Sequence, residues 1–511
     1  MPTCGEHVTT VAALVADRAS RWEGDLAIVD GGLRLTFGDL GARAAAVAGA
    51  LVDGGVRRGD RVAIWAQNGY EWIVCALGLQ LAGAALVPLN TRFKAREVAD
   101  ILAQSKTRVL VSTGTFLGRD YPASVEPFAA QLPELTAVYA IGPTASTRAR
   151  PWSDLTAGNP ELGWARGATV TGDDLCDVLF TSGTTGRAKG AVCTHASTVR
   201  ASATLAGVVG LRRHDRYLIV NPFFHAFGYK AGWVGCLLTG AVVYPMAVFD
   251  VEQALRTVER ERITVFPGPP TVFWSLLESG AWQEVDLSTL RMTITGSTGV
   301  PASLLLRMRD DLGFRDICVG YGLTEANGLG TMCRPGDPIE VVTATNGPPI
   351  PGMELRFTPD GEILLRGHLM KEYLDDPQAT AEAIDAEGWL HTGDIGELDA
   401  GGNLLVLDRK KDIFLVGGFN VYPAEIEAFL LEHPQIACAA VVGVADERMG
   451  EVGHAFVVPT AGATVGEDEL IGWCRERMAS FKVPRHVTLC TELPQTANGK
   501  VRKDLLRARS G

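Results

Sequence analysis

Hydrophobic positions in the first part of the chain alternate between two spacings. Short runs of consecutive apolar residues, typical of buried strands, separate longer segments whose apolar residues recur every three or four positions, as on the buried face of a helix. These spacings predict strands at 27–30, 61–65, 85–88 and 109–111, and helices at 9–21, 40–51, 70–81 and 94–104. The alternation predicts α/β layers with a mostly parallel sheet.

The pattern changes further along the chain. Residues 143–172 are rich in Pro, Gly, Thr and Trp and have little periodicity, which predicts a long surface connection. A second α/β series follows, with strands predicted at 217–220, 241–244 and 263–266 and helices at 231–238 and 251–260. From residue 354, short alternating strands at 354–357, 362–365 and 403–406 predict a small β-rich subdomain.

The charged segment Asp408-Arg-Lys-Lys-Asp412 follows an apolar strand and precedes a stretch of α+β texture, so it marks a boundary. We predict an N-terminal domain over 1–407, a hinge over 408–411 and a C-terminal domain over 412–511. The predicted fold class is α/β, with a large N-terminal domain of layered α/β subdomains plus a small β-rich subdomain, followed by a small mobile α+β domain.

Composition narrows the class of partner. The 511 residues are 47% apolar and 21% charged with a net charge of −12, and acidic and basic residues are interspersed. This balance is ordinary for a soluble globular protein and argues against nucleic acid or an anionic membrane as the main partner. The longest apolar stretch, 72–89, is broken by Gly and Pro, so we expect no membrane span.

The N-terminus lacks the basic and apolar regions of a signal peptide, which predicts a cytoplasmic protein. Ten cysteines are scattered without a C-x-x-C pair, mostly in apolar runs, and are predicted to be buried reduced thiols. The oligomeric state stays open, with a homodimer as one candidate.

One stretch concentrates phosphate-binding chemistry: Thr181-Ser-Gly-Thr-Thr-Gly-Arg-Ala-Lys-Gly190. Small residues permit close approach of the backbone, hydroxyls donate hydrogen bonds and the lysine brings positive charge, which suits a polyphosphate. Apolar runs at 176–180 and 190–194 flank the loop, so it joins two strands before a helix that Ser197 is predicted to cap. A P-loop would need Ser or Thr after the lysine and a helix at once, which excludes that class. An ordinary surface loop is the remaining alternative.

Six motifs in order carry a resemblance to the adenylate-forming superfamily of acyl-CoA synthetases, luciferases and adenylation domains. They are the loop at 181–190, Tyr321-Gly-Leu-Thr-Glu325, Gly388-Trp-Leu-His-Thr-Gly-Asp394, the segment at 408–412, Gly417-Gly-Phe-Asn-Val-Tyr-Pro-Ala-Glu-Ile-Glu427 and Asn498-Gly-Lys500. The segments 221–230, 267–270 and 322–334 further resemble actinobacterial acyl-CoA synthetases of steroid catabolism. Those enzymes activate a propanoate side chain on the two-ring indanedione remnant of the steroid nucleus.

The resemblance implies a two-step reaction with ATP, Mg²⁺ and CoA. A carboxylic acid attacks the α-phosphorus of ATP, and the CoA thiol then displaces AMP from the acyl-adenylate. The residues expected to hold the phosphates are Thr181, Ser182, Gly183, Thr184, Thr185, Gly186 and Lys189. Thr324 is expected at the α-phosphate and Glu325 on the metal, because a hard cation prefers carboxylate oxygen.

The resemblance also places the nucleoside and the second substrate. The adenine is expected near Ser297, Thr298 and Gly299, stacked on Tyr321. Asp394 is expected to hold the ribose hydroxyls, with Arg409 adding a ribose or phosphate contact. Gly417 and Gly418 are expected at the pantetheine channel.

Three further residues receive roles by resemblance. Lys500 is expected over the acyl carboxylate and α-phosphate during adenylation, although read alone it would be a solvated lysine. His225 is expected to gate the acyl pocket, although read alone it would be a core histidine. Lys411 matches the hinge about which the C-terminal domain rotates. The side chains expected to shape the acyl pocket are Phe227, Tyr229, Lys230 and Trp233, with Lys230 meeting a substrate oxygen or pointing to water.

Other functions on the same scaffold stay open. A CoA ligase for another aromatic or medium-chain acid and an adenylation enzyme that loads a carrier protein in trans both fit the motifs. A luciferase-like oxygenase also uses this scaffold. A non-catalytic homologue is disfavoured because it would have no need of Lys189, Glu325, Asp394, Arg409 and Lys500 together.

Overall fold

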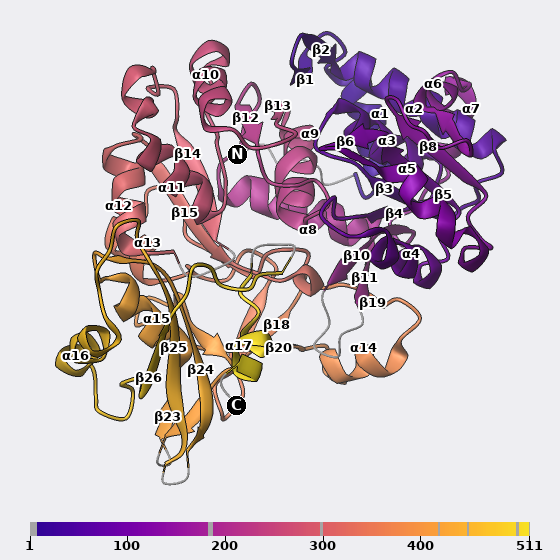
Figure 1. Cartoon of the computed structure of the whole chain (residues 1–511). Coiled ribbons are helices and arrows are strands. Elements are labelled where there is room, and N and C mark those ends of the chain that lie inside the picture. The colour runs from indigo at the N-terminus through magenta and orange to yellow at the C-terminus, as the bar shows by residue number, and fades with distance from the viewer. Residues whose placement is uncertain are drawn as a thin grey trace.

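A computed structural model of the chain describes residues 8–181, 188–296, 300–416, 419–446, 449–496 and 500–509. Figure 1 shows the N-terminal α/β layers at the upper right, and the C-terminal elements, in orange and yellow, at the lower left. The mixed α/β class with a large N-terminal domain and a small C-terminal domain agrees with the sequence prediction.

An eight-stranded sheet forms the first layer, in the order β19-β11-β10-β4-β3-β5-β8-β9. Strands β3 to β5, β8 and β9 pair in parallel, β10 joins β4 in parallel, and β11 and β19 are antiparallel. The strand bounds are Arg61–Trp65 for β3, Ala85–Pro88 for β4, Val109–Thr113 for β5, Ala137–Ile141 for β8, Ala149–Pro151 for β9, Leu175–Thr181 for β10, Lys189–Thr194 for β11 and Glu372–Tyr373 for β19. The predicted mostly parallel sheet is therefore present.

Helices accompany this sheet as the periodicity predicts. They are α1 (Val11–Arg21), α2 (Phe37–Asp53), α3 (Tyr70–Leu81), α4 (Ala95–Gln104), α5 (Tyr121–Val125), η1 (Glu126–Gln131), α6 (Trp152–Thr156), α7 (Pro160–Gly167) and α8 (His195–Val208), and a small hairpin of β6 (Thr115–Phe116) and β7 (Arg119–Asp120) lies among them. The residue predicted to cap α8 is wrong. Thr194 is the N-cap, and Ser197 completes a reciprocal capping box with it.

The connection predicted at 143–172 is wrong in part, because it contains β9, α6 and α7. Helix α7 packs on α2 through small residues, and a methyl group added at Gly163 would meet the Ala45 carbonyl oxygen at 2.0 Å. Contact through glycine and alanine leaves no apolar periodicity for a sequence reading to detect.

The second α/β series contributes two sheets. One has the order β12-β13-β1-β2 and the other β14-β15-β16. Their bounds are Leu26–Asp30 for β1, Leu33–Thr36 for β2, Arg216–Ile219 for β12, Val242–Pro245 for β13, Met292–Gly296 for β14, Asp316–Tyr321 for β15 and Thr331–Met332 for β16. The predicted strand at 263–266 reduces to single bridges from Val265 to Tyr217 and to Met292, because Pro267 and Pro269 turn the chain at once.

The helix predicted at 231–238 starts earlier and is split. A π-helix, η2 (Phe227–Val234), precedes α9 (Gly235–Thr239), and Gly232 has non-helical backbone angles inside η2. The remaining helices of this region are α10 (Val251–Glu261), α11 (Pro270–Ser279), η3 (Ala281–Glu284), α12 (Ala302–Asp310), η4 (Thr324–Ala326) and α13 (Ile339–Ala344).

A four-stranded antiparallel sheet in the order β17-β18-β20-β21 is the predicted β-rich subdomain. Its strands are β17 (Glu354–Phe357), β18 (Glu362–Arg366), β20 (Leu390–Leu398) and β21 (Leu404–Arg409), with α14 (Pro377–Ala383) beside it. The C-terminal domain holds β22 (Phe414–Val416), β23 (Phe419–Val421), α15 (Pro423–Leu431), β24 (Ile436–Asp446), β25 (Gly450–Pro459), α16 (Glu467–Arg477), β26 (His486–Leu489) and α17 (Lys503–Arg509).

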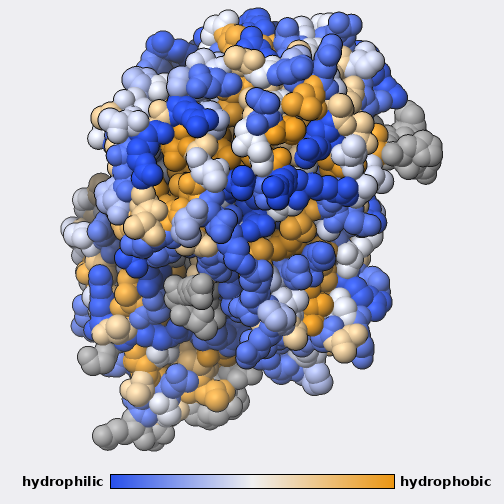
Figure 2. Space-filling model, turned by 90° about the vertical axis from the view of Figure 1, so that its right-hand side faces the viewer, coloured by the Kyte–Doolittle hydropathy of each residue, from blue (hydrophilic) through white to orange (hydrophobic). Residues whose placement is uncertain are grey.

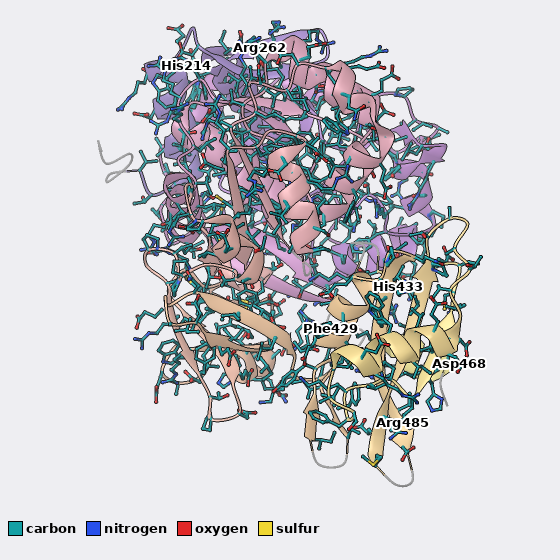
Figure 3. The ribbon with its side chains drawn as sticks, turned by 90° about the vertical axis from the view of Figure 1, so that its left-hand side faces the viewer. His214, Arg262, Phe429, His433, Asp468 and Arg485 are labelled. Carbon is teal, nitrogen blue, oxygen red and sulfur yellow. The ribbon has the colours of Figure 1, made fainter. Side chains whose placement is uncertain are left out.

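The buried clusters divide at the charged segment. The large cluster that includes Val11 ends at Leu404, and the clusters of the C-terminal domain begin at Phe414. Figure 3 shows Phe429 and His433 within this C-terminal part and His214 and Arg262 at the opposite end of the molecule. The domain bounds at 407 and 411 stay a prediction.

The nine described cysteines form no disulfide. Seven are buried, as predicted, whereas Cys438 is exposed and Cys490 is half-buried. On the face shown in Figure 2, hydrophilic and hydrophobic residues intermingle. Within the described ranges, the helices are all too short or too polar to cross a membrane.

Candidate active site

The candidate phosphate loop connects two paired strands. Strands β10 and β11 are antiparallel neighbours, and Thr181 and Lys189 are opposite each other at the loop end of the hairpin. This confirms that the loop joins two strands. The predicted contacts at Ser182, Gly183, Thr184, Thr185 and Gly186 lie outside the described residues.

Glu325 lies beside this hairpin on η4, the short turn after β15. Its Oε1 atom accepts a hydrogen bond of 2.8 Å from the Tyr373 hydroxyl and one of 3.5 Å from Thr181 Oγ1. The Lys189 Nζ atom is 5.1 Å from the centre of the Tyr373 ring. Thr181, Lys189 and Glu325 are therefore gathered around one tyrosine.

Tyr373 is a residue that the sequence reading missed. It belongs to β19, which pairs with β11 at Ala191, and burial followed by the Glu325 charge raises the pKa of its hydroxyl, which stays protonated as a donor. Its stretch, Lys371-Glu-Tyr373, has no motif that would mark it in sequence. Only the pairing of β19 with the hairpin brings it to the site.

The described residues contain no cluster of three or more His, Cys, Asp and Glu side chains that would enclose a metal by themselves. Glu325 is a single carboxylate at the hairpin, and Mg²⁺ is commonly bound by one or two carboxylates together with substrate phosphates and water. The site therefore fits a magnesium ion that arrives with a nucleotide, with Glu325 as its protein ligand.

Asp394 forms a second cluster on β20 and β21. Its Oδ2 atom accepts a hydrogen bond of 2.7 Å from the Tyr321 hydroxyl, and its Oδ1 atom is 3.2 Å from Arg409 Nε. Asp394 and Arg409 are cross-strand partners, so the sheet register sets this contact. Burial, followed by the charge of Asp394, raises the pKa of Tyr321, which stays a donor.

Lys500 comes to these groups from the C-terminal domain. Its side chain keeps contact with solvent, yet its pKa is lowered, first by lost solvation among the surrounding protein groups and then by the Arg409 charge. Asp394 and Glu325 oppose that shift. Because the charges of all three groups act on its pKa, the Lys500 ammonium group is within electrostatic range of both clusters.

His225 borders the same space. The side chain is half-buried, and lost solvation, followed by the Lys500 charge, lowers its pKa to about 4. The imidazole is therefore neutral at pH 7. Its Nδ1 atom accepts a hydrogen bond of 3.2 Å from the Phe227 amide, which fixes the ring at the start of η2.

Lys411 lies where the two domains meet. Its carbonyl oxygen is 3.5 Å from Arg507 Nη2 on α17, and the same guanidinium pairs with Asp412 at 2.7 Å. The remaining predicted contacts, Ser297, Thr298, Gly299, Gly417 and Gly418, lie outside the described residues.

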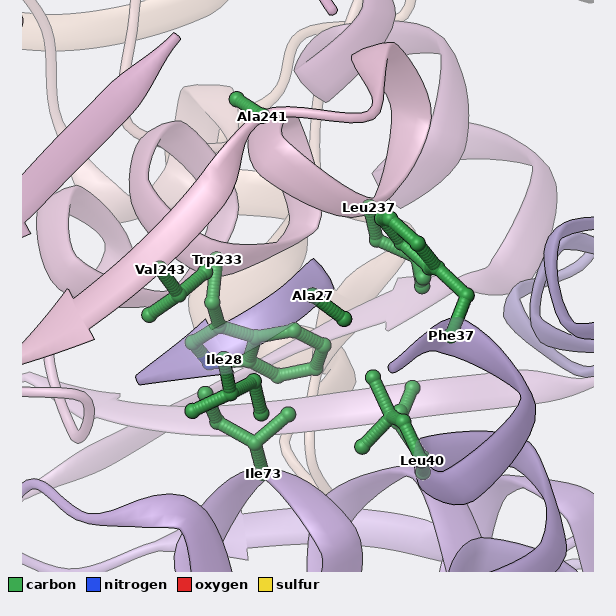
Figure 4. Close-up of a pocket in the computed structure, with 10 residues that line it drawn as sticks. Ala27, Ile28, Phe37, Leu40, Ile73, Trp233, Leu237, Ala241 and Val243 are labelled. Atoms are coloured by element: carbon green, nitrogen blue, oxygen red, sulfur yellow. The ribbon is translucent and has the colours of Figure 1, made fainter. Parts of the chain in front are cut away.

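Three residues expected to shape the acyl pocket are enclosed in the protein core. Tyr229, Lys230 and Trp233 are each at most 2% exposed. Trp233 lines a small apolar cavity of about 10 Å³ with Phe37, Leu40 and other core residues (Figure 4), which is too small for a substrate. Lys230 pairs with buried Asp177 at 3.0 Å, so the expectation that it meets a substrate oxygen or water is wrong.

The family follows from this fold and these residues. The chain belongs to the AMP-binding enzyme family: the AMP-binding enzyme model matches residues 15–374, and the model of the AMP-binding enzyme C-terminal domain matches residues 425–500.

Comparison with individual proteins shows which enzymes of this family the chain is similar to. Two proteins named 3-[(3aS,4S,7aS)-7a-methyl-1,5-dioxo-octahydro-1H-inden-4-yl]propanoyl:CoA ligase are 48% identical to the chain. The one from Rhodococcus jostii (strain RHA1) matches over 98% of this chain and 99% of its own length, and the one from Mycobacterium tuberculosis (strain ATCC 25618 / H37Rv) over 93% and 94%.

Solved structures agree with this class. The anthranilate CoA ligase AuaEII in complex with anthranoyl-AMP has a TM-score of 0.86 and 27% identity, with 98% of this chain and 97% of that chain covered. ATP-bound MatB from Rhodopseudomonas palustris has a TM-score of 0.84 and 28% identity, with 98% of both chains covered. Both the class of enzyme and its closeness to indanedione propanoyl-CoA ligases agree with the sequence prediction.

Proposed function

We propose that the protein is an ATP-dependent acid–CoA ligase that acts on a propanoate side chain of a steroid-derived ring system. The observation that carries the proposal is the 48% identity, over nearly the full length of both chains, to a ligase named for the indanedione propanoate. The acid becomes an acyl-adenylate and then an acyl-CoA, with release of pyrophosphate and AMP.

The first step joins two anions and therefore needs charge neutralisation and positioning. A carboxylate oxygen bonds to the α-phosphorus, and the bond from that phosphorus to the bridging oxygen of pyrophosphate breaks. Lys189 and the hairpin loop hold the departing pyrophosphate, Thr324 donates to the α-phosphate, and Lys500 neutralises the charge between acid and α-phosphate. Support comes from Asp394 and Glu325, whose charges both act on the pKa of Lys500.

Magnesium, when bound, would supply positive charge that offsets the charge of the phosphates. Glu325 is its proposed protein ligand, with the Tyr373 hydroxyl and Thr181 holding the carboxylate in place. Asp394 accepts from the ribose hydroxyls, and Tyr321 and Arg409 fix its two oxygens.

In the second step the sulfur of CoA bonds to the acyl carbon, the carbon–oxygen bond to AMP breaks, and the thiol proton goes to solvent. Neutral His225 lines the path to that carbon and adds no positive charge that would trap the approaching thiolate. Lys500 has to leave for the thiol to enter, which requires rotation of the C-terminal domain about Lys411.

A panel of acids tests the proposal. CoA consumption and ATP–pyrophosphate exchange are measured with steroid-derived ring propanoates, aromatic acids and fatty acids side by side. We expect the highest kcat/KM for a bicyclic ring propanoate. Preference for an aromatic or medium-chain acid would reject the substrate, and exchange without consumption of free CoA would indicate a carrier-protein acceptor.

We further propose a cytoplasmic location, since ATP and CoA are intracellular, and a homodimer as the assembly to be tested by light scattering. Neither is needed for the chemistry above.

A further inference from the structure

A buried ionic network lies beneath the candidate site. Lys230 Nζ is 3.0 Å from Asp177 Oδ1 and donates a hydrogen bond of 2.7 Å to Asn327 Oδ1. Asp177 Oδ2 accepts from Thr198 Oγ1 at 2.9 Å and from the Tyr229 hydroxyl at 3.3 Å. Lys230, Asp177 and Asn327 are 2%, 0% and 4% exposed, so the three side chains are enclosed by protein.

Lys230 keeps its positive charge at neutral pH. Although burial alone would lower the pKa of Lys230, the charge of Asp177 raises it above the ordinary lysine value. A buried ion pair carries a desolvation cost that often cancels its attraction, so stability is a weak reason for keeping one. Such a pair more often serves to hold the elements that it joins in one arrangement.

The three residues come from three different parts of the site. Asp177 is on β10, four residues before Thr181 at the mouth of the phosphate hairpin. Lys230 is on η2, which His225 precedes, and the Tyr229 amide donates to the His225 carbonyl at 3.0 Å. Asn327 directly follows η4, which carries Thr324 and Glu325. The Lys230 ammonium group therefore connects η2, on which it lies, to β10 through Asp177 and to the end of η4 through Asn327.

Asn327 is built to hold that turn. Its φ of 55° is left-handed, and its amide closes the turn by donating to the Thr324 carbonyl at 3.0 Å. Its side chain uses both ends: Oδ1 accepts from Lys230, and Nδ2 donates to the His368 carbonyl at 3.0 Å. The segment after His368 leads to Met370, whose amide donates to the Glu325 carbonyl at 2.7 Å.

We propose that Lys230, with Asp177 and Asn327, is a positioning residue that fixes the Thr324–Glu325 turn against the phosphate hairpin. The inference rests on the proposed adenylation function. Lys230 touches neither substrate nor metal in this scheme. It acts through Asn327, so loss of the contact moves Glu325 and Thr324 relative to Thr181 and Lys189 and weakens the binding of magnesium–nucleotide.

Asn327→Gly is the test variant. Glycine accepts the left-handed backbone at least as well as asparagine, so the turn is retained, while both side-chain hydrogen bonds are lost. His214→Gly is the matched control. His214 is also left-handed, with a φ of 69°, is exposed, and lies at the far end of the molecule in Figure 3.

Two measurements are made on the full chain. Calorimetric titration with Mg²⁺ and α,β-methylene-ATP reports binding without turnover, because the bond that adenylation breaks is replaced, and ATP–pyrophosphate exchange reports the Mg²⁺ concentration at half-maximal rate. We expect both constants to rise about tenfold in Asn327→Gly, as for loss of a hydrogen bond to a charged group, while the KM for the acid stays within about twofold. His214→Gly should match the wild type.

Wild-type constants in Asn327→Gly would overturn the proposal, as would a slower reaction with unchanged binding of the analogue. If Asn327→Gly does not fold, the same measurements are made on Asn327→Asp. This variant keeps an oxygen that accepts from Lys230 and loses the Nδ2 donor to the His368 carbonyl. Binding close to that of the wild type supports the Lys230 contact, and a tenfold loss overturns it. A wild-type protein without exchange on any acid would instead reject the proposed function.

Discussion

At the scale of single residues, His195 illustrates a buried group whose protonation is linked to folding. It begins α8 and is fully buried, and its Nδ1 atom accepts a hydrogen bond of 3.3 Å from the Val11 amide. Lost solvation lowers its pKa from 6.5 to about 4. Neutral imidazole is thus the form that the folded protein accommodates, whereas the unfolded chain binds a proton near pH 6.5.

The pH dependence follows from that difference. Stability is fully present above pH 6.5 and is lost as the pH falls from 6.5 to about 4, since the unfolded state binds more protons in that window. The loss amounts to about 3 kcal/mol for this one group. In His195→Asn, whose amide oxygen replaces Nδ1 as acceptor, urea unfolding between pH 7 and 4 should show a smaller decrease. An equal decrease of the free energy of unfolding with falling pH in the two proteins would contradict this prediction. His225 is present in both proteins, so its contribution cancels in the comparison.

The candidate site residues that could be predicted from the sequence are those that lie in motifs. Lys500, Glu325, Asp394, Arg409 and Lys189 carry motifs. Arg409 pairs with Asp394, and Lys189 and Glu325 both lie at Tyr373, whereas their roles in catalysis stay a prediction. Lys230 and Tyr373 show the limit. Whether Lys230 meets a substrate or an aspartate depends on which side of η2 it lies on, which the sequence does not show. Tyr373 reaches Glu325 because β19 pairs with β11, and these strands are more than 170 residues apart in sequence.

At the scale of elements, the contact between α2 and α7 is closer than ordinary helix packing. Gly163 on α7 has no room for a side chain, because an added methyl group would meet the Ala45 carbonyl oxygen at 2.0 Å and its carbon at 2.9 Å. Both atoms are backbone and do not move without displacing α2. Glycine is therefore required by packing at this position.

Gly163→Ala should lower the free energy of unfolding by about 1–3 kcal/mol, the usual range for overpacking. The control is Gly207→Ala on α8, where the added methyl group meets nothing within 4 Å and helix propensity improves stability by up to about 1 kcal/mol. Urea unfolding followed by circular dichroism compares the two. Equal stability changes of the same sign would show that α7 adapts freely.

Elements with strong periodicity were predictable, and those without it were not. The bounds of α3, β3 and β4 agree residue for residue with the sequence prediction. Helix α7 was missed because its contact surface is made of glycine and alanine, and η2 was misplaced because a π-helix with a break at Gly232 does not repeat every 3.6 residues.

At the scale of the whole molecule, Lys500 reaches the site only through the relative placement of the two domains. In Lys500→Ala, adenylate formation should fall by about 10²-fold or more because the charge between acid and α-phosphate is lost. Transfer from pre-made acyl-adenylate to CoA should be unchanged, since that step needs the lysine gone.

Arg502→Ala is the control, because Arg502 is an exposed cation two residues away whose described contact is with Asp504. Both half-reactions are followed separately, by pyrophosphate exchange and by thioester formation. An equal loss in both half-reactions of Lys500→Ala would contradict a lysine that serves adenylation alone.

The division of the buried clusters between Leu404 and Phe414 has a consequence for the history of such chains. A crossover between two related genes at this point separates no pair of packed core side chains, so each half arrives in the recombinant with its interior intact. What has to match across a junction just after Asp412 is a few polar contacts, such as the Asp408 carboxylate with the Ala424 amide and Asp412 with Arg507. The two parts of the chain are therefore free to be inherited from different ancestors.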